Sequence, residues 1–220
     1  MTAPNPPEPA EPRAAGAANA DGGAEPAPSR RPRTAARVAA EIVETLALTL
    51  VIFLVVQNFV AQPFKVDGSS MEDTFLNGQY VLVDRLSHDW SAYARGQVIV
   101  FQPPADAGGG GYPFIKRVIG VAGDTVELRA GTVYVNGTAL AEPYVFRDAS
   151  GQPQPTMPLN GQTRWTVPPG DLFVLGDHRE VSEDSRAFGP IPVSSVIGRA
   201  FVRYWPLADA GLVQTPAYAP

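Results

Sequence analysis

With 220 residues, the chain is long enough for one domain of about 150 to 200 residues plus extensions. Its net charge of −5 at a charged fraction of 18% predicts no basic surface for nucleic acid. The chain has no cysteine, which excludes disulfides, thiolate metal sites and cysteine proteases. Its two histidines, His88 and His178, argue against a histidine-rich metal site, and we expect neither a metal nor a cofactor.

The N-terminal residues 1–36 are rich in Pro, Ala, Gly and Glu and contain almost no large apolar side chain. Such a segment cannot bury enough surface to offset the entropy lost on ordering, so we expect a disordered tail. Arg30, Arg31, Arg33 and Arg37 form a basic cluster at its end.

An apolar segment follows, and we expect a transmembrane helix over residues 37–62. No charged residue occurs from Thr45 to Phe64, a run of 20 residues. Such a helix is roughly 30 Å long, which matches a hydrocarbon core, and Pro63 would end it. The alternative, a buried core helix, would need a large helical domain around it. The preceding arginines predict a cytoplasmic N-terminus and an extracytoplasmic remainder. We expect the membrane to be the plasma membrane.

Residues 63–206 have the pattern of a mainly β domain. Short apolar runs alternate with Gly- and Asn-containing turns, which is typical of an antiparallel sheet or sandwich. Residues 141–165 are rich in Pro and Gln and are expected to form a surface excursion, and residues 207–220 a loose C-terminal tail. We expect strands at 80–83, 97–101, 112–120, 125–128, 132–135, 171–175 and 196–204.

The stretch from Val66 to Phe75 presents a candidate nucleophile, Ser70, directly after the apolar segment. Gly68 permits a tight or left-handed backbone, and the small Ser69 allows close approach of a substrate. The alternative is that both hydroxyls only bond to the backbone of a turn.

Lysine is rare in this chain: of 17 basic residues, only Lys65 and Lys116 are lysines. Arginine keeps its proton in proteins, whereas a buried lysine can lose it. Lys65 follows the apolar segment, where lysine is typically an interfacial anchor. Lys116 lies in a strand pattern with Phe114 and Val118 on the same face.

Burial between these neighbours would lower the pKa of Lys116 from about 10.4. Without that shift, the neutral form would lie roughly 4 kcal/mol uphill at pH 7, so a role as general base requires burial. The alternative is a lysine on an edge strand whose ammonium reaches solvent.

The charged stretch from Gly176 to Arg186 follows an apolar strand. Such a stretch is usually a solvated loop with local ion pairs. A conventional triad of Ser70, His178 and Asp177 is a further alternative, but neighbouring residues on an extended chain point in opposite directions.

Together these stretches resemble the bacterial type I signal peptidases, membrane-bound Ser-Lys proteases. The resemblance runs in order over most of residues 38–204. It rests on the apolar segment and on Gly-Ser-Ser-Met-x-x-Thr, Arg-Gly-x-Val-Ile-Val-Phe, Ile-Lys-Arg-Val-Ile-Gly and Gly-Asp-x-Arg-x-x-Ser-x-Asp-Ser-Arg.

The resemblance implies that Ser70 is the nucleophile and Lys116 its general base. It gives Ser182 the role of orienting the lysine, and it implies an oxyanion donor in the backbone N–H of Ser70. Some family members place a second donor, a serine side chain, where this chain has Gly68, so that donor is left open. This chain also departs from the family's pattern at Asp73, Ala122 and His178. The charged residues that would support the site are Asp177, Asp184, Arg186 and Arg117.

The implied function is removal of signal peptides from secreted preproteins by a membrane-bound serine endopeptidase. Such peptides end in a small-x-small pattern before the cut. The expected partners are these preproteins and the lipid bilayer, with the export machinery as a candidate. Two alternatives remain: a Ser-Lys self-cleaving repressor, which would carry a DNA-binding domain, and a catalytically silent, membrane-tethered β-domain that acts as an adaptor for exported proteins.

Overall fold

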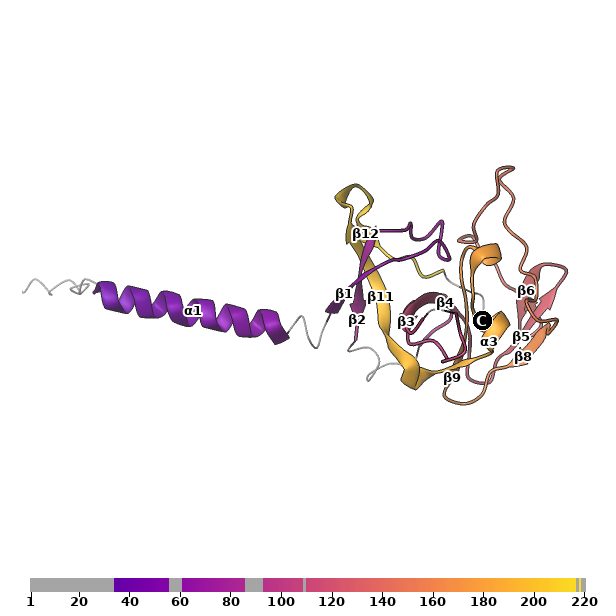
Figure 1. Ribbon diagram of the computed structural model, residues 1–220, viewed down its shortest axis with the longest axis horizontal. Coiled ribbons are helices and arrows are strands. Elements are labelled where there is room, and N and C mark those ends of the chain that lie inside the picture. Colours follow the sequence, from indigo (N-terminus) through magenta and orange to yellow (C-terminus); the bar gives the residue numbers. More distant parts are fainter. Residues whose placement is uncertain (1–33, 56–60, 86–92, 109, 217, 219–220) are drawn as a thin grey trace, which may run out of the picture. The chain divides into compact units, whose positions relative to one another are not determined.

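The computed structural model describes residues 34–55, 61–85, 93–108, 110–216 and 218 (Figure 1). Most of the predicted disordered tail, residues 1–33, therefore lies outside the described residues. The same holds for residues 56–60 of the predicted membrane span and for His88.

Helix α1 runs from Ala35 to Val55. Within the described residues, the structure contains no helix with the length and apolar character needed to cross a membrane. The last two residues of the predicted helix, Ala61 and Gln62, belong to strand β1 (Ala61–Lys65). Pro63 also lies in this strand, at the edge of a sheet, where the missing N–H of a proline is tolerated.

The described residues of the domain form two antiparallel sheets, which confirms the mainly β prediction. The larger sheet has the order β1-β2-β11-β3-β4-β9-β10, and β12 pairs with β11. Besides β1, its strands are β2 (Tyr80–Asp84), β3 (Val98–Phe101), β4 (Phe114–Val121), β9 (Asp171–Leu175), β10 (Ile191–Pro192), β11 (Val196–Trp205) and β12 (Gly211–Leu212).

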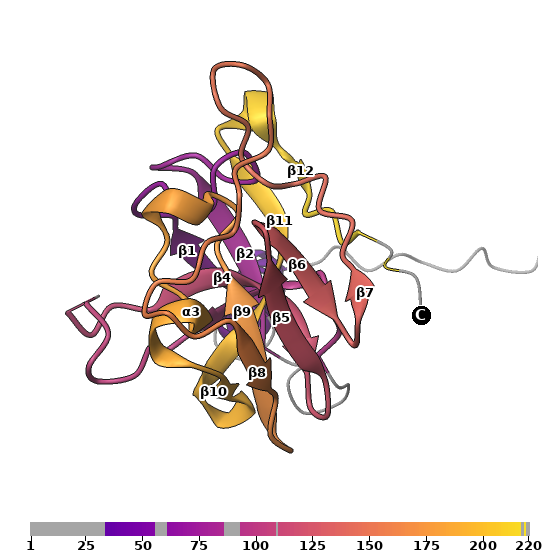
Figure 2. The ribbon, with the colours of Figure 1, turned by 90° about the vertical axis from the view of Figure 1, so that its right-hand side faces the viewer.

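The smaller sheet has the order β7-β6-β5-β8 and is seen in Figure 2. Its strands are β5 (Thr125–Arg129), β6 (Thr132–Val135), β7 (Thr138–Ala139) and β8 (Arg164–Thr166). Short helical turns are η2 (Arg179–Val181), α3 (Ser185–Phe188), η3 (Val193–Ser195) and η4 (Leu207–Asp209). The predicted surface excursion is partly buried, because Val145 and Thr156 are almost inaccessible to solvent.

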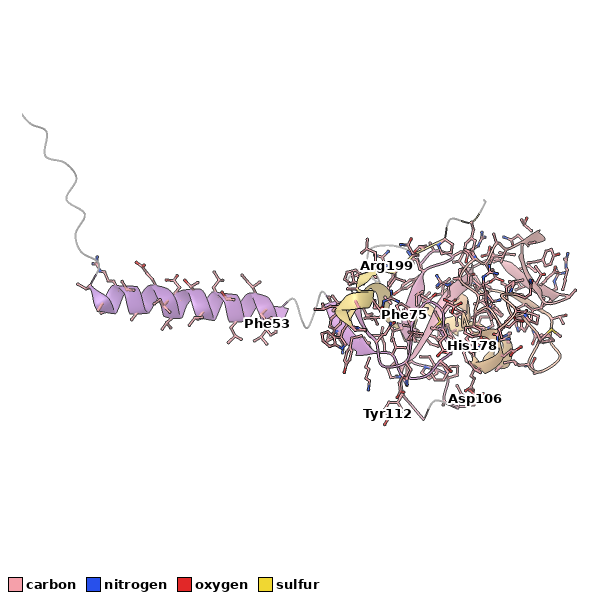
Figure 3. All side chains as sticks on the ribbon, turned by 90° about the horizontal axis from the view of Figure 1, so that it is seen from above. Phe53, Phe75, Asp106, Tyr112, His178 and Arg199 are labelled. Carbon is pink, nitrogen blue, oxygen red and sulfur yellow. The ribbon has the colours of Figure 1, made fainter. Side chains whose placement is uncertain are left out.

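Apolar packing holds the turn that carries Ser70 against the larger sheet. Met71 and Phe75 are each 1% exposed and pack with Val66, Val81 and Val83. Burial of one such side chain contributes about 1.5 to 3 kcal/mol. The turn is therefore fixed on both sides of Ser70 by the core, and Phe75 lies inside the domain in Figure 3.

The C-terminal segment is packed, which corrects the prediction of a loose tail. Strand β12 pairs with β11, and the N–H of Val213 donates to the carbonyl of Phe201. Further along, the carbonyl of Gln214 accepts a hydrogen bond from Arg117, and the hydroxyl of Tyr218 lies 2.6 Å from that of Tyr144. These partners are distant in the sequence, so local composition could not reveal them.

Strand β11 passes so close to β2 that only glycine fits at position 198. A Cβ at Gly198 would lie 2.3 Å from the carbonyl oxygen of Asp84. We expect Gly198→Ala to lower the free energy of unfolding by about 1 to 3 kcal/mol, because backbone must shift. Thermal unfolding measures this effect. Gly211→Ala is the control, since its Cβ would meet nothing within 4 Å; equal melting temperatures for both variants would contradict the prediction.

Candidate active site

A groove with a volume of about 490 Å³ runs past Ser70. Val66, Val81, Val100 and Ile115 contribute apolar side chains to its lining. At its rim, Tyr112 is 77% exposed and projects from the domain in Figure 3. Residues Phe64 to Val66, at the end of edge strand β1, also line the groove, so an extended chain could lie beside this edge.

Ser70 and Lys116 meet in this groove. The ammonium nitrogen Nζ of Lys116 lies 2.7 Å from Ser70 Oγ, within hydrogen-bonding distance. Lys116 belongs to β4, which is held between β3 and β9, and Ile99 is its partner on β3. The contact thus joins a strand inside the sheet to a turn that is anchored in the core.

Lys116 is only 4% exposed. Burial lowers its pKa to about 8, although the charges of Asp184, Asp177 and Glu183 act in the opposite direction. At pH 7 roughly a tenth of such lysines are neutral, far more than at the ordinary pKa. A pKa in this range meets the requirement that a general base be partly neutral near neutral pH.

The next residue in β4, Arg117, points to the opposite face and forms a buried ion pair with Asp177. Arg117 Nε and Nη2 donate to the two carboxylate oxygens of Asp177 at 2.9 and 2.6 Å. The hydroxyl of Thr74, four residues after Ser70, donates to Asp177 Oδ2 at 2.5 Å. The pair therefore connects β4, the Ser70 turn and the segment after β9.

Asp184 and Arg186 organise the loop after β9. Arg186 Nε and Nη2 donate to the two oxygens of Asp184 at 2.8 and 2.9 Å. Asp184 also accepts the N–H of Gly176, and Arg186 donates to the carbonyls of Arg179 and Ser182. Both side chains are buried, so this loop is an ordered part of the domain and not a solvated charged segment.

Ser182 lies in this loop with a buried hydroxyl that has no hydrogen-bond partner in the part of the chain that the structure describes. The resemblance gave this hydroxyl the role of orienting Lys116, and the structure contains no hydrogen bond between them. Gly176 allows Ser182 to pack near the Ser70 turn. A Cβ at Gly176 would lie 2.2 Å from Ser182 Oγ and 2.6 Å from the carbonyl oxygen of Ser70.

Gly68 adopts a positive φ of 99°, and its N–H donates to Asn77 Oδ1 at 3.0 Å. That N–H is thus engaged inside the turn, and glycine has no hydroxyl. Gly68 supplies no oxyanion donor in this arrangement, and the N–H of Ser70 remains the expected donor.

The triad alternative is not formed. The ring of His178 stacks on Phe146 with centroids 3.9 Å apart, and its Nδ1 lies 3.1 Å from Glu72 Oε2. His178 reaches Ser70 only through its backbone N–H, which donates to the carbonyl of Ser70 at 3.0 Å. Asp177 is engaged by Arg117.

The contacts of Glu72 and Thr74 were not predicted from the sequence. The only indication of them was the threonine in the motif Gly-Ser-Ser-Met-x-x-Thr. No group of His, Cys, Asp or Glu side chains among the described residues is arranged to hold a metal ion.

Comparisons with known proteins find similarity to signal peptidases. The family model described as "Signal peptidase, peptidase S26" matches residues 39–205. Signal peptidase IB of Staphylococcus aureus is 34% identical over 169 residues, which cover 72% of this chain and 85% of the relative. The probable signal peptidase I-2 of Synechocystis is 33% identical over 169 residues, covering 76% and 73%. A solved signal peptidase I from Enterococcus faecalis is 36% identical, with a TM-score of 0.39, covering 50% of this chain and 97% of that one.

Because a Cβ at Gly176 would collide with both Ser182 and the carbonyl of Ser70, we expect Gly176→Ala to displace the Ser70 turn. A displacement of about 1 Å can reduce the rate of an enzymatic reaction by about 10²-fold. Comparing kcat/KM with that of Gly211→Ala tests this, with circular dichroism to establish that both variants are folded. Full activity of a folded Gly176→Ala protein would show that the close packing at this position is dispensable.

Proposed function

Since the chain belongs to the peptidase S26 family of signal peptidases, it is a hydrolase of that class, and we propose that it uses Ser70 as nucleophile and Lys116 as general base. The single observation that carries the proposal is the distance of 2.7 Å between Lys116 Nζ and Ser70 Oγ. Membership in an enzyme family favours this function over the adaptor. His178 is the weaker candidate for the base because its ring is engaged by Glu72 and Phe146.

In the proposed mechanism, neutral Lys116 accepts the proton of Ser70 as Oγ attacks the carbonyl carbon of the scissile peptide bond. The backbone N–H of Ser70 stabilises the oxyanion that develops. Collapse of the tetrahedral intermediate breaks the C–N bond, and the Lys116 ammonium returns its proton to the leaving amine. Lys116 then deprotonates a water molecule that hydrolyses the acyl-enzyme and regenerates the Ser70 hydroxyl.

The supporting residues act by position. Arg117 and Asp177 fix the strand of the base relative to the turn of the nucleophile, while Asp184 and Arg186 order the loop that carries Ser182. We propose that Ser182 orients the lysine when substrate is bound, which its unpartnered hydroxyl supports within the described residues.

We propose that the substrate is a secretory preprotein cut after a small-x-small sequence. The apolar lining of the groove supports binding of an extended segment with small side chains, and strand β1 offers a sheet edge for its backbone. The uncharged sequence between Thr45 and the start of strand β1 at Ala61 supports a single membrane anchor that begins near residue 37. The catalytic domain would then lie outside the plasma membrane, close to emerging signal peptides and the export machinery.

We expect Ser70→Ala and Lys116→Ala each to reduce kcat by at least about 10³-fold, because each removes a group that makes or breaks a covalent bond. The measurement is cleavage of a preprotein ending in Ala-x-Ala by the detergent-solubilised full chain. Lys65→Ala, the other lysine, is the matched control and should retain activity at the chemical step. Activity that survives Lys116→Ala but is lost in His178→Ala would assign the base to histidine.

The pH dependence of kcat/KM should reflect the protonation state of Lys116. Only neutral Lys116 accepts a proton, so kcat/KM should rise tenfold per pH unit below its pKa of about 8 and level off above it. A rise with its midpoint near the ordinary histidine pKa of about 6.5, unchanged by substitution of Lys116, would rule out this base.

A further inference from the structure

Three carboxylates act on Lys116, and they differ in how their charges are compensated. Asp177 is paired with Arg117, and Asp184 with Arg186. Glu183 also acts on Lys116, but no lysine or arginine among the described residues forms an ion pair with it. Asp184 and Asp177 act on the pKa of Lys116 more strongly than Glu183 does, but each of these two charges is offset by its arginine partner.

Glu183 is held in place at the groove. It lines the same cavity as Ser70 and Lys116. Its Oε1 accepts the N–H of Gly108, in the loop between β3 and β4, at 2.9 Å. A Cβ at Gly108 would lie 2.9 Å from Glu183 Oε2, so the loop backbone packs directly against the carboxylate. A long side chain at the rim of a groove is thereby fixed in one orientation.

We propose that Glu183, a carboxylate held in the groove by the Gly108 backbone, is a positioning residue that adjusts the pH at which Lys116 becomes a base. The inference rests on the proposed function of Lys116. The other charged groups facing the lysine are Asp177, Asp184 and Arg186, all already engaged in ion pairs. Lys65 and Asp67 also line this groove.

The direction of the effect follows from charge. A carboxylate stabilises the lysine ammonium, so Glu183 opposes the effect of burial and keeps the pKa of Lys116 higher than burial alone would. When the charge of Glu183 is removed, the lysine should become neutral at a lower pH. At a pH below the midpoint, a larger fraction of the enzyme then has a neutral Lys116. At high pH, where all Lys116 is neutral, the rate should not change.

The test is the pH dependence of kcat/KM for an Ala-x-Ala substrate, measured with the full chain in detergent. In Glu183→Gln, the amide oxygen can still accept the Gly108 N–H, but the charge is absent. We expect the midpoint of the rise to fall by about 0.3 pH unit, as for a half-exposed charge, so that kcat/KM near pH 6.5 rises roughly twofold. The plateau at high pH should match the wild type.

A control variant separates the charge of Glu183 from the overall charge of its loop. Glu180→Gln removes an exposed charge from the same loop and should leave the midpoint unchanged.

An unchanged midpoint in Glu183→Gln, or an equal shift in Glu180→Gln, would overturn the inference. Retained activity in Ser70→Ala or Lys116→Ala would instead overturn the proposed function, so the two failures are distinguishable.

Discussion

The buried ion pair between Arg117 and Asp177 is the interaction on which the rest of the site depends. It joins strand β4, the turn after β1 and the segment after β9 through hydrogen bonds to Thr74 and to the carbonyls of Gly96 and Gln214. A buried charge without its partner costs several kcal/mol, so any arrangement that separates Arg117 from Asp177 is strongly disfavoured. Because neighbours in a strand face opposite ways, fixing Arg117 on one face fixes Lys116 on the other.

That geometry creates an electrostatic balance around one lysine. Burial disfavours its ammonium, and three carboxylates favour it. Since Asp177 and Asp184 also serve as structural partners of arginines, they cannot change without loss of the fold around the site. Glu183 has no arginine partner among the described residues, and its carboxylate accepts only the N–H of Gly108 there. It is therefore the position at which the balance can vary while the scaffold stays intact.

Local sequence patterns predicted much of the fold and of the candidate site. Alternating apolar residues identified most strands of the larger sheet, and the rarity of lysine singled out Lys116. The features that the sequence did not predict depend on contacts between segments that are distant along the chain. Pro63 suggested the end of a helix but lies in an edge strand, and the C-terminal segment lacked a pattern although Tyr218 reaches Tyr144. The stacking of His178 on Phe146 and its bond to Glu72 likewise depend on the tertiary fold.

The separations along the chain also determine when the site can exist. Lys116 and Ser70 are 46 residues apart, Thr74 and Asp177 are 103 apart, and Arg117 and Gln214 are 97 apart. Folds dominated by such non-local pairings form slowly, because each must close a long loop before contacts repay its entropy. During synthesis on the ribosome, Ser70 and Lys116, the proposed nucleophile and base, both emerge long before Asp177. Under this proposal a nascent chain carries both reacting groups before the ion pair that aligns them can form.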